Sequence, residues 1–156
     1  MAELKDRLRA DLTRAIKSRN TTTLATLRMA LAAVATEEVA GSAARELSDD
    51  EVLAVLAREA KKRREAADAF AGAGRDELAA RERAEGEVLA AYLPAQLDDQ
   101  EVERLVAEAV DEVTGQLGER PGPRQMGAVM KAATARVAGR AEGSRVAAAV
   151  RTVLRN

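Results

Sequence analysis

The stretch that decides the fold is residues 98–113, DDQEVERLVAEAVDEV. Its apolar residues recur at spacings of three and four. As a result Val102, Leu105, Val106, Ala109 and Val113 lie within about a quarter-turn of a 3.6-residue helical wheel, and the acidic residues fall on the other side. The pattern predicts an amphipathic helix with one face in a hydrophobic core.

Two helix starts carry the same local signal. Asp98 is followed three residues later by Glu101, and Ser48 in the same way by Glu51. In such a capping box the first side chain accepts a hydrogen bond from the third amide of the helix, while the glutamate reaches back to the capping amide. We therefore expect helices to begin at both places.

The composition favours helices along the rest of the chain. Of the 156 residues 47% are hydrophobic but only 1% are aromatic, namely Phe70 and Tyr92. A core of Ala, Leu, Val and Met suits helix-on-helix packing better than a sheet, which favours β-branched and aromatic residues. Ala, Arg and Glu are also strong helix formers. The sequence predicts an all-α protein.

Periodicity, glycine and proline divide the chain into seven expected helices in two domains. Four helices are expected in residues 1–94, an N-terminal helical domain that ends at Pro94, which cannot donate the next helical hydrogen bond. Residues 95–156 are expected to form a three-helix tail domain. Two apolar stripes are predicted to face the core, Leu4, Leu8, Leu12 and Ile16 in the first helix and Met126, Val129, Met130, Ala133 and Val137 in the sixth.

Charge is divided sharply within the tail. Residues 98–119 hold eight acids and one base, a net charge of −7, whereas residues 120–156 hold eight bases and one acid, a net charge of +7. Such asymmetry in a chain with a net charge of −1 suggests a nucleic acid or another polyanion as partner. The alternative is an acidic helix packed beside basic ones, each screening the other.

Several kinds of chemistry have no residues to perform them. The chain has no Cys and no His, which excludes disulfides, thiolate nucleophiles, Cys/His zinc sites and histidine acid–base catalysis. The serines are isolated, and no phosphate-binding glycine loop or metal-spaced carboxylate set is present. No catalytic residue, metal or cofactor is therefore expected. The charged start and the longest apolar run, residues 29–35, favour a cytoplasmic protein without a membrane partner.

Four stretches together resemble a known family. They are residues 27–31 (LRMAL), residues 61–66 (KKRREA) followed by Phe70, residues 85–97 with YLPAQL at the end, and MGAVM at 126–130 followed by GRAEGSRV at 139–146. In this order they are similar to the small bacterial YqeY proteins of the GatB/YqeY family. The tail also resembles the C-terminal domain of GatB, the tRNA-engaging subunit of the glutamine-dependent aspartyl/glutamyl-tRNA amidotransferase.

The resemblance implies a two-part helical fold and a tRNA-binding tail. It also implies the activity attached to the family, a carbon–nitrogen ligase with glutamine as amido-nitrogen donor, for which this chain has no nucleophile. We expect a noncatalytic accessory protein that binds tRNA or a tRNA–synthetase or amidotransferase complex, and no DNA. A protein–protein adaptor and an accessory subunit of such a ligase are the alternatives.

Basic residues of the tail are the candidate tRNA contacts, and they are Arg124, Lys131, Arg136, Arg140, Arg145 and Arg151. Gly143 and Ser144, at an expected helix start, are possible phosphate contacts, although turn geometry alone also explains the glycine. The basic run at residues 61–64 has acids one turn away, as in Glu59–Arg63 and Lys61–Glu65, and this favours a solvated helix face over a binding site.

Overall fold

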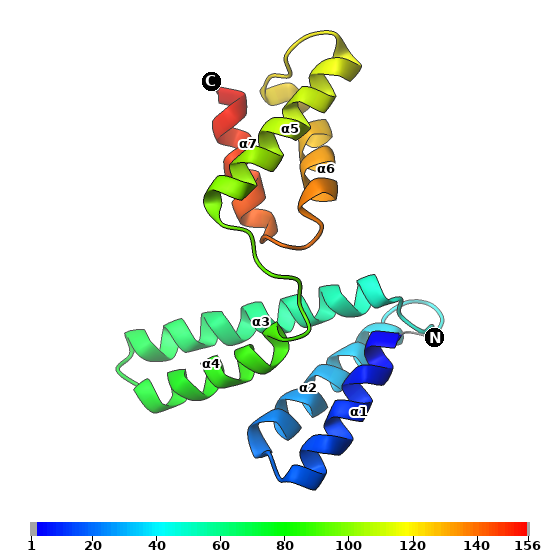
Figure 1. Cartoon of the computed structure of the whole chain (residues 1–156), viewed down its shortest axis with the longest axis vertical. Coiled ribbons are helices and arrows are strands. Elements are labelled where there is room, and N and C mark those ends of the chain that lie inside the picture. The colour runs from blue at the N-terminus through cyan, green and yellow to red at the C-terminus, as the bar shows by residue number, and fades with distance from the viewer. Residues whose placement is uncertain (1–2, 156) are drawn as a thin grey trace. The chain divides into compact units, whose positions relative to one another are not determined.

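The computed structural model describes residues 3–155, and over this range the chain forms seven α-helices, one short 3-10 helix and no strand (Figure 1). The all-α prediction is confirmed. The chain divides into two compact units, Met1–Leu93 (unit 1) and Pro94–Asn156 (unit 2). That each unit folds as an independent domain stays a prediction.

Unit 1 consists of two helix hairpins (Figure 1). In the first, α1 (Glu3–Ser18) packs on α2 (Thr21–Glu38), and in the second α3 (Asp49–Gly72) packs on α4 (Asp76–Ala90). Their shared core consists of Leu8, Leu27, Ala30, Val34, Leu47, Val52, Val55, Leu56 and Leu89. It therefore forms where the first hairpin meets the beginning of α3 and the end of α4.

The end of α4 is tied to α1 by a contact that links residues 81 apart in sequence. The hydroxyl of Tyr92 donates a hydrogen bond to a carboxylate oxygen of Asp11, and the Arg7 guanidinium lies 4.8 Å from the centre of the tyrosine ring. Burial raises the pKa of the Tyr92 hydroxyl above its ordinary value. No local sequence pattern signals this contact.

The start of α3 is held by charge-assisted hydrogen bonds. Ser48 and Glu51 form the predicted capping box, with the Ser48 amide 2.8 Å from a Glu51 oxygen. The Arg45 guanidinium donates to both Glu51 oxygens, at 2.9 and 2.7 Å. These bonds, with Arg45 first, lower the pKa of Glu51 from 4.5 to about 2.

Glu51→Gln is expected to reduce the sensitivity of unit 1 to acid. Because the folded pKa of Glu51 is lowered, its contribution to stability is present above about pH 4.5 and is lost as the pH falls through about 2. Glutamine can still accept from the Ser48 amide, so the cap persists. Urea midpoints at about pH 5 and about pH 2.5 should differ less in this variant than in the wild type. Glu87→Gln, at an exposed position on α4, is the control, and equal acid sensitivity of all three proteins would contradict the prediction.

Unit 2 is a three-helix structure whose core is almost entirely Val and Ala. It contains α5 (Asp99–Leu117), the 3-10 helix η1 (Pro123–Gln125), α6 (Met126–Val137) and α7 (Gly143–Arg155). The predicted capping box of Asp98 and Glu101 is present. The core consists of Val102, Leu105, Val106, Ala109, Val110, Val113, Val129, Ala133, Val137, Val146, Val150 and Leu154. The predicted apolar face of residues 98–113 is thus confirmed, with Val110 added to it.

One residue of the predicted stripes is placed wrongly. Ile16 is 50% exposed, and Ala15 is buried in its place. Four-residue steps advance 40° more than one full turn, so a stripe from Leu4 has drifted by about a third of a turn at Ile16 and has left the core. In α6, Met126 and Met130 are only partly buried at the margin of the core.

Pro94 is the expected stop of the fourth helix, whereas α4 ends earlier, at Ala90. Residues before a proline are disfavoured in helical geometry, and the chain closes instead with turn hydrogen bonds from Tyr92 to Leu89 and from Leu93 to Ala90.

Candidate nucleic-acid interface

The predicted tRNA-binding residues all belong to unit 2, but the structure gives them different surroundings. Arg136 and Arg145 contact the acidic helix α5. An Arg136 nitrogen lies 3.3 Å from Glu108 and another lies 4.0 Å from Glu112. Arg145 donates to Asp99 at 2.8 Å and to the carbonyl of Leu97 at 3.0 Å. The charges of these two arginines are therefore screened by the acidic helix α5, which is the alternative to a polyanion partner.

The Arg140 side chain caps the C-terminal end of α6. Its guanidinium donates to the carbonyls of Val137, at 3.0 Å, and of Arg136, at 2.9 Å. Carbonyls in the last turn of a helix have no partner within the helix, and a cation near them is also favoured by the helix dipole. The backbone carbonyl of Arg140 accepts from the amide of Leu97, which closes the start of the unit onto the turn between α6 and α7. Arg140 therefore has a structural role.

Three predicted contacts extend into solvent. Arg124 in η1, Lys131 in α6 and Arg151 in α7 are exposed, and within residues 3–155 their side chains make no hydrogen bond or ion pair. Arg155, at the end of α7, is exposed in the same way. These side chains form the solvent-facing basic set of unit 2, and their charges are available to an anionic ligand.

Gly143 and Ser144 are exposed at the first turn of α7. The Glu142 carbonyl accepts hydrogen bonds from the amides of Arg145 and Val146, at 3.0 and 3.1 Å, which are the usual bonds of a first helical turn. No contact distinguishes this turn as an anion site, and phosphate binding there stays a prediction.

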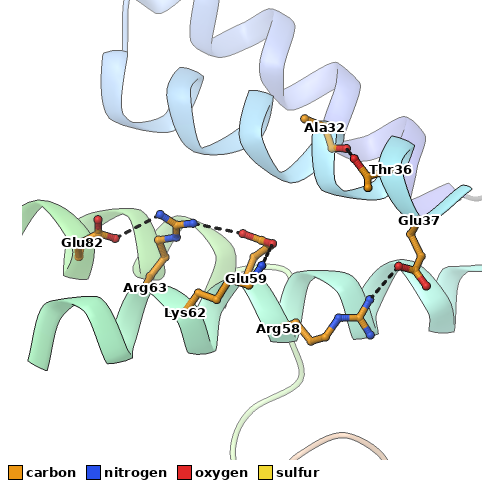
Figure 2. A network of polar contacts seen from close by, with 8 residues as sticks. All are labelled: Ala32, Thr36, Glu37, Arg58, Glu59, Lys62, Arg63 and Glu82. Carbon is orange, nitrogen blue, oxygen red and sulfur yellow. Dashed lines mark hydrogen bonds and ion pairs between the residues drawn. The ribbon is translucent and has the colours of Figure 1, made fainter. Parts of the chain in front are cut away.

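The basic run at residues 61–64 is engaged within unit 1. Lys61 pairs with Glu65 at 3.9 Å, as predicted, and Lys62 lies 3.2 Å from Glu59. The predicted pair of Arg63 with Glu59 is present at 3.3 Å. The sequence did not indicate that Arg63 also reaches α4, where Glu82 lies at 3.4 Å (Figure 2). Glu85 of the same helix lies 3.8 Å from Arg63. These contacts support the structural interpretation of this run.

Two serines of the described part of the chain make hydrogen bonds with a structural role. Ser48 caps α3, and the Ser18 hydroxyl donates to the Ala15 carbonyl. Within residues 3–155 no group of three or more acidic side chains is placed to hold a metal ion. None of the helices in that range is both long enough and apolar enough to cross a membrane.

Two helical units, the second with unpaired basic side chains on its surface, define a two-part all-α protein with a candidate polyanion-binding tail. Residues 5–154 match the family described as Yqey-like protein. The chain therefore belongs to the YqeY-like family. A comparison with curated proteins found no match.

Proposed function

We propose that this chain is a noncatalytic accessory protein that binds folded RNA, with tRNA as the expected partner, through the exposed basic side chains of unit 2. The observation that carries the proposal is the division of the basic residues. Arg136 and Arg145 form ion pairs with acidic side chains of α5. Arg124, Lys131 and Arg151 remain exposed and have no partner among residues 3–155.

The chemistry of this surface favours folded RNA over single strands. Unpaired bases are usually held by stacking on aromatic side chains, and Phe70 and Tyr92, the chain's two aromatic residues, both lie in unit 1. Lysine and arginine can instead hold the phosphates of a structured RNA without reading its sequence. The resemblance of the tail to the C-terminal domain of GatB supports tRNA as that RNA, and a cytoplasmic location goes with it.

The triple change of Arg124, Lys131 and Arg151 to Gln is expected to weaken the binding of unfractionated tRNA at every salt concentration tested. Each neutralised phosphate releases condensed counterions, so losing three contacts should make the slope of log affinity against log salt shallower by about three. Titrations between about 50 and 200 mM salt measure that slope. All tRNA species should be affected alike, because phosphate contacts carry no sequence information.

The matched control removes three exposed arginines from unit 1, Arg75, Arg81 and Arg83, which likewise have no partner among the described residues. This control should keep the wild-type slope. If the wild-type protein binds no tRNA at low salt, or if the triple variant binds as well as the wild type, the proposal is wrong. An acidic protein partner that depends on the same three residues would then support the adaptor alternative.

A further inference from the structure

The turn that leads from α1 into α2 (Figure 1) carries a second group of exposed basic side chains. Residues 12–36 contain four basic residues and no acid. Elsewhere in unit 1, as at residues 59–65, basic side chains pair with acidic ones within one helical turn. The turn between α1 and α2, which we call the α1–α2 corner (residues 14–22), is therefore a region of one charge sign.

The charges of this corner have few partners within the protein. Arg14 pairs with Asp11, whose side chain is 16% exposed. Lys17 and Arg19 are exposed, and neither side chain makes a hydrogen bond or an ion pair within the described part of the chain. Arg28, farther along α2, is exposed and unpaired in the same sense. A ligand could contact Lys17 and Arg19 without breaking any contact of unit 1.

Hydroxyl groups accompany these charges. Thr21 and Thr22 are exposed beside Lys17 and Arg19, whereas the Ser18 hydroxyl donates to the Ala15 carbonyl. The Asn20 side chain already caps α2, since its oxygen accepts a hydrogen bond from the Thr23 amide at 3.1 Å. Phosphate oxygens in nucleic acids are held by lysine, arginine, serine and threonine side chains together. The composition of the corner therefore suits phosphates.

The backbone at Arg19 makes the tight turn between α1 and α2. Arg19 has a φ of 57°, in the left-handed region that is unfavourable for residues with a Cβ. Ala138 occupies such a position as well, with a φ of 50°, as do Gly74, Gly118 and Gly139. At the α1–α2 corner an arginine occupies such a position although its side chain stabilises nothing within unit 1. This conformation closes the end of α1, where the Asn20 amide donates to the Ala15 carbonyl at 3.0 Å, and it leaves the Arg19 side chain exposed to an anionic ligand.

We propose that the α1–α2 corner is a second phosphate-contacting surface for folded RNA, formed by Lys17 and Arg19 with the neighbouring hydroxyls. The inference rests on the proposed function and extends it from one surface to two. The corner has no aromatic side chain of the kind that anchors protein–protein interfaces, so RNA fits it better than an acidic protein.

The test compares two double variants of the full chain with equal changes in charge. In the corner variant Lys17 and Arg19 become Gln, and in the control variant Arg81 and Arg83, exposed on α4, become Gln. Both should retain the wild-type helical circular dichroism, since none of these side chains has a partner within residues 3–155. Binding of unfractionated tRNA is measured across a salt series.

The corner variant should bind about tenfold more weakly than the wild type at low salt, and its salt slope should be shallower by about two. The control variant should change affinity by less than about twofold. If the corner variant matches the control while the triple variant of Arg124, Lys131 and Arg151 is weakened, the corner is not an RNA contact and the proposed function stands. If the wild type binds no tRNA, both proposals fail together.

Competition separates RNA from an acidic protein partner. Poly-glutamate at equal charge concentration should displace the tRNA poorly from the wild type. Stronger binding of poly-glutamate than of tRNA, lost in the corner variant, would overturn the assignment of RNA as the partner.

Discussion

Leu56→Ala is expected to lower the free energy of unfolding of unit 1 by about 2–5 kcal/mol. Leu56 is 0% exposed in the core that both hairpins share. Removing its side-chain carbons loses their transfer energy and leaves a cavity between helices that cannot fully close. Because typical domains are stable by only about 5–15 kcal/mol, this loss is a large share of the total.

The fluorescence of Tyr92 makes this loss measurable in the full chain. The chain has one Tyr and no Trp, and Tyr92 lies in unit 1, so urea titrations followed by its emission report the unfolding of that unit. The control is Ile16→Ala, at a position 50% exposed, which should cost less than about 0.5 kcal/mol. Equal losses in the two variants would contradict either the burial of Leu56 or the exposure of Ile16.

Arg63→Met is expected to cost about 3 kcal/mol. Arg63 lies between Glu59, Glu82 and Glu85, and the side chains of all four residues are at most 19% exposed. Methionine keeps most of the volume of the arginine stem but removes the cation, so three carboxylates remain close together with little water to screen them. The expected loss is reduced from the fully buried range because Arg63 retains some exposure.

A second arginine of α3 provides the matched control for Arg63. Arg58 pairs with Glu37 of α2 at 3.6 Å, and both side chains are about half exposed (Figure 2). Arg58→Met should therefore cost less than about 1 kcal/mol. Neutralising Glu59 and Glu82 to Gln should recover part of the stability lost in Arg63→Met, yet destabilise the wild type. A purely additive result would mean that the cluster does not act as a unit.

The helices and their starting points could be predicted because the signals are local. The capping boxes at Ser48 and Asp98 involve residues three apart, and the apolar face of α5 repeats within a few turns. Such patterns depend on the geometry of a single helix, which is the same in every protein. The drift of the first stripe away from the core at Ile16 also follows from that geometry, once the 3.6-residue period is applied strictly.

The candidate site could be predicted only as a list of basic residues. Arg136 and Arg124 look alike in the sequence, yet Arg136 contacts Glu108, 28 residues away, whereas Arg124 has no partner in the described chain. The +7 charge of residues 120–156 indicated where a polyanion could bind but not which charges α5 already neutralises. That distinction arises when α5 packs against α6 and α7.

The amino-acid sequence by itself determined the helical class of this protein, the two capping boxes, the charge division of the tail and its membership of the YqeY-like family. Only the tertiary structure decided which arginines are structural, how Arg63 joins α3 to α4, and that Tyr92 reaches Asp11. The physical reason is the separation along the chain over which each interaction acts. Helix propensity and capping act between neighbours along the chain, whereas the partner of a charged side chain is set by helices that meet only after the chain has folded.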